Sequence, residues 1–243
     1  MKVNTNSNTY IIIYSVVMVV IVAVLLSLAS LGLKERQDAN ILNEKQTQIV
    51  KALGEDPATV AYGDVITKAA LLDASGAVVS EDEKEVFAAL NDLKASFEAG
   101  KYPIFVATSG VVAPLYGAGL WGPIWGYIAL DTDMNTVKGI VLDHSGETPG
   151  LGAEITTAKH QAQYVGKSIF EGEELVGITL KKGGADKGSL HEVDAISGGT
   201  KTCDGVSAMI QSSLNYYKPY FDAARATTDT AAEVEAESNV VNE

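Results

Sequence analysis

The residues best suited to chemistry lie in a short turn with two glycines, Ser197-Gly198-Gly199-Thr200. Glycine allows the backbone to take positive φ and to approach a ligand closely. A helical pattern follows at once, so Thr200 lies beside a helix N-terminus, where unpaired N–H groups and the positive end of the dipole favour an anion. The turn predicts a place where a phosphate group meets a hydroxyl. The same residues also fit an ordinary turn before a capped helix.

The helix that follows the turn is predicted from apolar residues at the i, i+3, i+4, i+7 spacing. Thr202 or Asp204 is a suitable N-cap for it, since both have short side chains with an acceptor oxygen. The positions that share its buried face are Val206, Met209, Ile210, Ser213, Leu214 and Tyr217. This face must hold the turn against the rest of a domain.

Composition excludes several classes of site. The 243 residues include 31 acidic and 18 basic side chains, for a net charge of −13. This balance argues against a nucleic-acid partner, because phosphate backbones are bound by a basic face. The single cysteine, Cys203, excludes an intramolecular disulfide and a cysteine-rich metal or iron–sulfur site. The histidines have no ligand spacing, so a zinc site is not expected.

The N-terminal segment predicts a membrane anchor. No residue between Lys2 and Lys34 is charged, and the segment is rich in Val, Ile and Leu. A bilayer core needs about 20 such residues in a helix. A cleaved signal peptide is the competing interpretation, but its apolar region is about 7–15 residues long and its start is more basic. Length therefore favours an uncleaved transmembrane helix over residues 1–33, in contact with membrane lipid.

The rest of the chain predicts an α+β fold in one domain. A helical stalk over 34–57 ends near Gly54 and Pro57, and a domain over 58–221 follows. Residues 222–243 form an acidic tail that we expect to be disordered. Strand and helix candidates interleave without a long βαβ series, which predicts a mixed sheet with flanking helices. The strand candidates are 64–67, 77–79, 104–107, 127–130, 136–142 and 178–180, and the other helical candidates are 81–99 and 153–170.

Three further stretches have residues that could contact a planar ligand. Trp121, in a run of glycines and aromatic residues, is either a flat wall for a ring or a side chain of the core or its rim. The loop 144–154 contains three glycines and a proline, and its N–H groups could bond the carbonyls of a heterocycle. Lys182 lies on a glycine-rich turn that lacks the Walker pattern, and there it could stabilise an electron-rich ring or a phosphate.

The run Asp194-Ala195-Ile196-Ser197-Gly198-Gly199-Thr200 resembles the flavinylation motif of bacterial FMN-binding domains, D-[GA]-x-[ST]-G-A-[TS]. In that family the last hydroxyl residue carries FMN through a phosphoester bond, which here would be Thr200. The chain has Gly199 where the family usually has Ala, and Cys203 where Ser is common. The missing methyl at Gly199 loosens the turn and leaves the acceptor in place.

The resemblance extends along the chain to the C subunits of the Na⁺-translocating NADH:quinone reductases. The matching stretches are Gly32–Asn40, Gly119–Trp121, Glu147–Gly152, Lys182–Ala185 and the flavinylation motif, in the order of that family. The related G subunits of the ion-translocating ferredoxin:NAD reductases share the T-P-G-L-G and S-G-A-T elements. The Gly-Leu-Trp and Lys-Gly-Gly-Ala runs fit the C subunits better.

This resemblance implies an electron carrier in a complex of the bacterial inner membrane. Electrons would enter from NADH at another subunit and leave to quinone at another, so the chain is not expected to be active alone. Its domain would lie on the periplasmic face, although the lysine and arginine count weakly favours the cytoplasmic side; that rule fails for long translocated domains. A Mg²⁺-dependent flavin transferase would attach the FMN, using FAD as donor.

The same resemblance implies which residues form the FMN site. Trp121 would lie against the ring, and Lys182 would lie near it and stabilise the negative charge of the reduced ring. Thr200 would serve only as the anchor, and no catalytic residue or metal ligand is expected. A membrane-anchored binding or scaffold domain without cofactor is the alternative. The expected FMN-binding residues are Asp194, Ser197, Gly198, Gly199, Thr200, Thr202, Trp121, Glu147, Thr148, Gly150, Leu151, Gly152 and Lys182.

Overall fold

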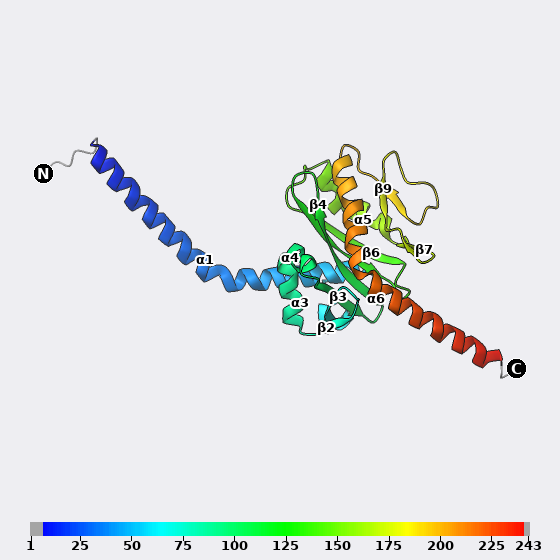
Figure 1. Ribbon diagram of the computed structural model, residues 1–243. Coiled ribbons are helices and arrows are strands. Elements are labelled where there is room, and N and C mark those ends of the chain that lie inside the picture. Colours follow the sequence, from blue (N-terminus) through cyan, green and yellow to red (C-terminus); the bar gives the residue numbers. More distant parts are fainter. Residues whose placement is uncertain (1–6, 241–243) are drawn as a thin grey trace. The chain divides into compact units, whose positions relative to one another are not determined.

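The computed structural model describes residues 7–240, with side chains as far as Thr227 (Figure 1). The chain divides into two units, Met1–Lys45 and Gln46–Glu243. The first unit consists of most of α1 (Asn8–Ala52), in which an 18-residue window has a mean hydropathy of 3.1 and is wholly exposed. Within the described residues, α1 is the one helix long and apolar enough to cross a membrane. The predicted N-terminal apolar helix is therefore confirmed.

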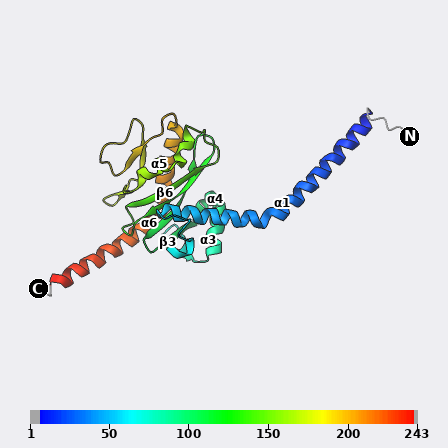
Figure 2. The same ribbon diagram turned by 180° about the vertical axis from the view of Figure 1, so that it is seen from behind.

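The second unit is built on a six-stranded sheet in the order β2-β1-β3-β4-β5-β6 (Figures 1 and 2). Every neighbouring pair in it is antiparallel, so this sheet is not mixed as predicted, whereas the predicted α+β class is confirmed. The strands are β1 (Ile66–Leu72), β2 (Val78–Ser80), β3 (Tyr102–Ala107), β4 (Gly110–Ala118), β5 (Pro123–Leu130) and β6 (Val137–His144). Parallel pairing occurs between β9 (Thr179–Lys181) and β10 (Glu192–Asp194), which form a separate small sheet.

Several predicted elements are shorter or shifted. Residues 62–65, partly predicted as strand, form α2 (Tyr62–Val65). The predicted helix 81–99 is divided into α3 (Glu83–Ala89), η1 (Leu90–Asp92) and α4 (Leu93–Glu98), because Asp92 leaves helical geometry and its carboxylate caps α4 by accepting from the Ala95 amide. The prediction of one helical segment over 153–170 is wrong. That region contains η2 (Gly152–Thr156), α5 (Ala158–Gln161) and η3 (Ala162–Tyr164), followed by β7 (Phe170–Glu171) and β8 (Glu174–Leu175).

The helix after the glycine turn is α6 (Thr200–Val240), and its predicted buried face is confirmed: each of the six residues is at most 1 % exposed. Because α6 begins at Thr200, the prediction of Thr202 or Asp204 as N-cap is wrong; both lie inside the first turns. The helix also continues beyond residue 221, where the sequence predicts the end of the domain. The predicted segment boundaries, and the disorder of the tail, stay predictions.

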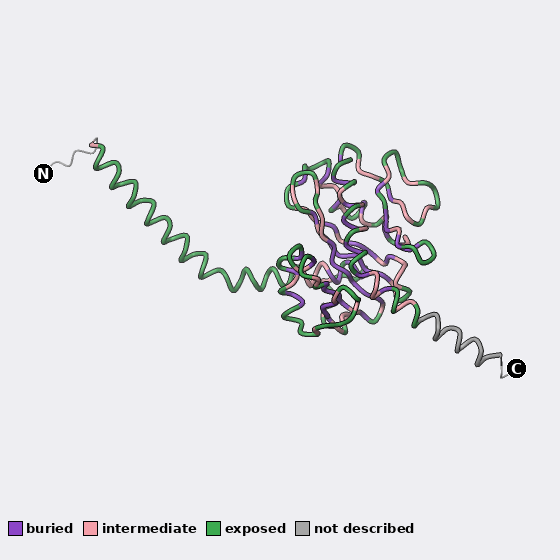
Figure 3. Tube along the Cα trace, in the orientation of Figure 1, coloured by how far each residue is buried: buried purple, intermediate pink, exposed green. Residues whose placement is uncertain are grey.

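Glycines let α6 approach β4 closely. A methyl group at Gly205 would overlap the carbonyl oxygen of Ala118, and one at Gly117 would lie 2.6 Å from Cβ of Met209. The buried residues therefore form a continuous core between α6 and the sheet (Figure 3). This contact fixes the start of α6, and with it Thr200, against the end of β4.

Candidate functional site

A hollow of about 460 Å³ lies at the glycine turn and brings the turn at 182–184 together with residues of the 194–200 motif. Five expected site residues line it, namely Lys182, Asp194, Ser197, Gly198 and Thr200. Ser197 and Thr200 are both exposed, so two hydroxyl groups are accessible in the same hollow. The remaining walls are Gly183, Gly184, Ala195 and Ile196.

The β9–β10 pair sets the walls of this hollow. In its parallel register Asp194 lies opposite Lys181, and the amide of Ala195 donates to the carbonyl of Lys181. The carboxylate of Asp194 accepts from the amide of Ala185 at 2.8 Å. Asp194 therefore ties the Lys182–Ala185 turn to the start of the motif, a task that does not require contact with a ligand.

The glycine turn leaves the side chain of Thr200 exposed at the start of α6. Gly198 has φ of +77°, and the Gly199 amide donates to the carbonyl of Ile196 at 3.0 Å. The first helical hydrogen bond runs from the Cys203 amide to the Gly199 carbonyl. Cys203 also accepts from the amide of Ile196 through its Sγ atom at 3.3 Å, so it closes the turn as a serine hydroxyl could. Burial raises the pKa of its thiol, which stays protonated.

Glu147 and Thr202 form a buried pair beneath the turn. Glu147 is 5 % exposed, and its Oε2 atom accepts from the Thr202 hydroxyl at 2.5 Å. Its Oε1 atom accepts from the amide of Trp121 at 2.9 Å. Burial alone would raise the pKa of Glu147, but the hydrogen bonds from Thr202, Trp121 and the Leu120 amide outweigh burial and lower the pKa. Both oxygens are thus used within the protein.

The loop before η2 lies over the glycine turn. The side chain of Leu151 packs against Gly198, where a Cβ atom would be 2.6 Å from its Cδ2. Gly152 is buried, and a methyl there would overlap the Thr202 hydroxyl. The carbonyl of Thr148 accepts from the amides of Leu151 and Ala153, each at 3.1 Å.

These bonds narrow the expectation that amides of the loop 144–154 bond a heterocycle. The amides of Leu151 and Ala153 are bonded to Thr148, and the amide of Gly150 donates to Oε1 of Glu154 at 3.1 Å. These three amides are therefore not free to bond a heterocycle, and for the other amides of the loop such a contact stays a prediction. Gly150 has φ of +75°, which explains a glycine at that position of the turn.

Three large apolar side chains in the segments beside Glu147 and Thr202 are exposed. Trp121 is 68 % exposed, so the interpretation of Trp121 as a core residue is wrong. Leu120 and Leu151 are 52 % and 41 % exposed. Leu120 was not among the expected site residues, although its place in the Gly-Leu-Trp run was a signal for it.

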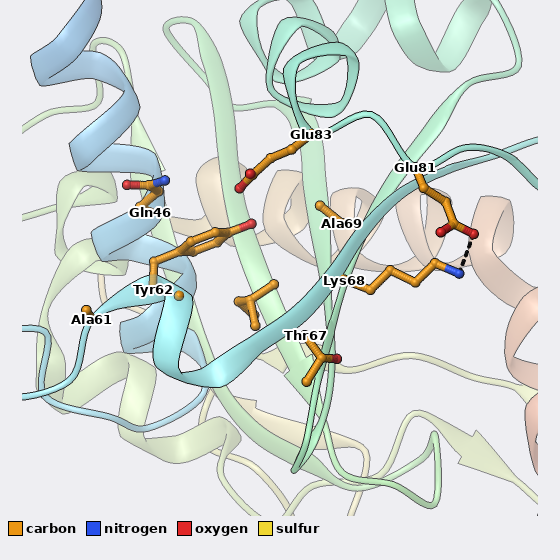
Figure 4. Close-up of a pocket in the computed structure, with 10 residues that line it drawn as sticks. Gln46, Ala61, Tyr62, Thr67, Lys68, Ala69, Glu81 and Glu83 are labelled. Atoms are coloured by element: carbon orange, nitrogen blue, oxygen red, sulfur yellow. Dashed lines mark ion pairs between the residues drawn. The ribbon is translucent and has the colours of Figure 1, made fainter.

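A second hollow of about 620 Å³ contains none of the expected site residues (Figure 4). The Tyr62 hydroxyl is buried there without a well-aligned hydrogen bond, and it points toward the Glu83 carboxylate. Burial raises the pKa of Tyr62, and the charge of Glu83 raises it further. Lys68, whose charge could compensate Glu83, is instead paired with Glu81 at 2.6 Å. In the described part of the chain, no group of three or more His, Cys, Asp or Glu residues is arranged to hold a metal ion.

Comparison with known proteins gives the site a context. Residues 119–215 match the family model of the FMN-binding domain, a range that contains every expected site residue. The C subunit of the Na⁺-translocating NADH-quinone reductase from Vibrio campbellii is 33 % identical over 215 residues, covering 76 % of this chain and 82 % of the relative.

The chain also resembles solved structures of C subunits. The crystal structure of the C subunit of the Na⁺-translocating NADH-quinone reductase from Parabacteroides distasonis has a TM-score of 0.71 and 36 % identity, and covers 78 % of this chain and 96 % of that one. The structure of NqrC from Shewanella oneidensis has a TM-score of 0.64 and 28 % identity, with coverages of 75 % and 97 %. The likeness therefore includes nearly all of each solved domain.

Proposed function

Because this chain belongs to the family of the C subunits of the Na⁺-translocating NADH-quinone reductases, we propose that it carries one FMN esterified through its phosphate to Thr200. It is a subunit of an oxidoreductase and has an FMN-binding domain. In our proposal it relays electrons between other subunits of the complex toward quinone and is inactive alone. The observation that carries the proposal is the exposed hydroxyl of Thr200 at the first residue of α6, in a hollow with positive-φ Gly198.

The residues present fit a phosphoester at this position. The first amides of α6 have no preceding helical carbonyl and favour an anion, and the hollow leaves Thr200 accessible to a transferase. Thr202 is 1 % exposed and donates to Glu147, so it is a poor acceptor for FMN. Ser197 is the competing acceptor, because its hydroxyl is also exposed in the hollow.

The bound flavin would supply the electron-carrying chemistry, and the chain would supply position and charge. We propose that Trp121 and Leu151 contact the ring as exposed apolar surfaces, and that Lys182 places a positive charge at the edge of the hollow. A phosphoester tether keeps the cofactor on the protein in every redox state. Asp194, Gly199, Thr148 and Gly152 would act by shaping the turn and the loop that hold the tether.

We also propose that α1 is a single-pass anchor in the bacterial inner membrane and that the domain is periplasmic. The uncharged apolar window of α1 supports the anchor, and membership of the family supports the placement. Protease added to spheroplasts should degrade the domain if it is periplasmic. Degradation only after lysis would place it in the cytoplasm.

The attachment is tested by expressing the chain with a flavin transferase and examining it by denaturing electrophoresis. The wild-type chain and Ser197→Ala should give a fluorescent band, and Thr200→Ala should not. Ser197→Ala is a matched control, because it removes the other accessible hydroxyl of the hollow. Fluorescence that persists in Thr200→Ala and is lost in Ser197→Ala would move the attachment to Ser197.

Two results would contradict the proposal for the chain as a whole. A colourless wild-type band would favour a membrane-anchored binding or scaffold domain. The partner proteins recovered after gentle solubilisation distinguish the proposed complex from the ferredoxin:NAD reductase, whose G subunit has the related motif. Recovery of the other subunits of the NADH-quinone reductase is the expected result.

A further inference from the structure

We propose that Glu147 is a positioning residue, which holds the Leu120–Trp121 segment at a fixed distance from the first turn of α6 and does not touch the flavin. This inference rests on the proposed function, since it concerns the geometry between the wall at Trp121 and the tether at Thr200. It also replaces the sequence-based expectation that Glu147 and Thr202 bind FMN directly.

The carboxylate of Glu147 joins two segments that are far apart in sequence. On one side, Oε2 accepts from the hydroxyl of Thr202, which is two residues from Thr200 on the same helix. On the other side, Oε1 accepts from the amide of Trp121. One rigid carboxylate therefore connects the helix that carries the tether with the segment that carries the exposed indole.

Glycines on both sides keep the carboxylate in this orientation. A methyl group at Gly119 would overlap Oε1 of Glu147, and one at Gly152 would lie 2.5 Å from Oε2. Because there is no spare room, the carboxylate cannot rotate without moving one of the segments it joins. The amide of Glu147 itself donates to Nδ1 of His144 at 3.2 Å, which holds its main chain in place.

The exposure of Leu120 and Trp121 shows why their segment needs the hydrogen bond to Glu147. Trp121 and Leu120 are more than half exposed, so packing contributes little to fixing them. Their segment contains Gly119 and Gly122, whose backbone is freer than that of other residues. The segment joins the paired ends of β4 and β5, and the hydrogen bond from the Gly119 amide to the Gly122 carbonyl, at 2.8 Å, closes it on itself. The carboxylate of Glu147 adds a side-chain hydrogen bond at the tip of this turn.

The test compares two disruptive variants with two matched controls in the flavin-loaded full chain. Thr202→Val removes the hydroxyl at nearly constant shape, and Thr202→Ser restores it. Gly152→Ala places a methyl against Thr202 and Glu147, whereas Gly146→Ala adds a methyl 3.9 Å from the nearest atom, the Trp121 carbonyl oxygen. Trp121→Phe shows how the flavin spectrum responds when the indole is lost.

The readouts are the mass of the flavin-bearing peptide, the flavin fluorescence and the visible circular dichroism. Thr202→Val and Gly152→Ala should retain the flavin mass and shift the fluorescence toward that of Trp121→Phe. Thr202→Ser and Gly146→Ala should match the wild type. Wild-type spectra in both disruptive variants would overturn the inference, as would loss of the flavin mass in Thr202→Val, since the pair would then serve attachment. Absence of flavin from the wild type would instead contradict the proposed function.

Discussion

The hydroxyl of Ser213 on α6 bridges the main-chain amide and carbonyl of Tyr116 on β4, accepting at 3.1 Å and donating at 3.3 Å. The β3–β4 ladder ends at Phe105 and Val112, so this part of β4 lies beyond it. One turn later on α6, the hydroxyl of Tyr217 donates to the carbonyls of Pro103 and Pro114. The helix thus supplies hydrogen bonds that a neighbouring strand supplies elsewhere in the sheet.

Ser213→Ala should lower the free energy of unfolding by about 1–3 kcal/mol, because it leaves polar groups of Tyr116 without their partner. Ser213 is fully buried, so water cannot replace the hydroxyl without opening the contact. Denaturant unfolding of the detergent-solubilised full chain measures the loss. Ser212→Ala is the control, since Ser212 is exposed and bonds only within the helix. Equal stability of the two variants would contradict this account of α6.

Acidification should lower the free energy of unfolding by protonating Glu147. Its pKa in the folded chain lies below the ordinary 4.5, so the folded state binds fewer protons than the unfolded state in that window. The stabilisation that ionised Glu147 provides is fully present above pH 4.5 and is lost as the pH falls through the pKa of Glu147 in the folded chain. Thr202→Val raises the folded pKa, so its unfolding free energy should fall less on acidification than that of Thr202→Ser. Parallel pH profiles of the two variants would exclude Glu147 as a source of acid sensitivity.

Lys182→Ala should lower the reduction potential of the bound flavin by roughly tens of millivolts, because an exposed charge makes a modest contribution. Lys182 lines the hollow, and its loss removes a cation that favours the reduced, more negative cofactor. Lys187→Ala is the control, since Lys187 is an exposed lysine of the same loop that does not line the hollow. Spectroelectrochemical titration of both proteins decides the role of Lys182. If both potentials equal that of the wild type, Lys182 has no part in tuning the flavin.

Gly199→Ala, which restores the usual residue of the motif, should be tolerated. Gly199 does not have positive φ, and an added Cβ would lie 3.3 Å from Ile196 Cγ2 and 3.4 Å from Gly152. These contacts are tight but need only a shift of a few tenths of an ångström. Less freedom in the unfolded chain should raise stability by about 0.4–1 kcal/mol, and flavin attachment should be at least as fast. A time course of attachment checks this, with slower attachment as the contradicting result.

Local patterns were sufficient to predict the helix face and one hairpin. The apolar spacing predicts the buried side of α6, and the neighbouring strand candidates 127–130 and 136–142 correspond to β5 and β6, which pair as a hairpin. The sequence did not predict β4, whose first six residues are buried on both faces and therefore lack an alternating pattern. The sequence also did not predict that the helix 81–99 is interrupted at Asp92, because the N-cap of α4 depends on the orientation of the Asp92 carboxylate.

The site itself was only partly predictable. The motif places Thr200, Ser197 and Gly198 together because they are neighbours in sequence. The bond between Glu147 and Thr202 spans 55 positions, so it follows from the tertiary fold and not from spacing. The family resemblance implied a ligand contact for Glu147, and the spacing gave no sign of its internal bond to Thr202.

The most direct test of the central claim is the mass of the tryptic peptide that contains Thr200. Cleavage after Lys187 and Lys201 yields a peptide that holds Thr200 and excludes Thr202. Protein matured with the transferase should give this peptide with the added mass of one esterified FMN, and fragmentation should place that mass on Thr200. A peptide of unmodified mass, or an added mass on another residue, would contradict the claim.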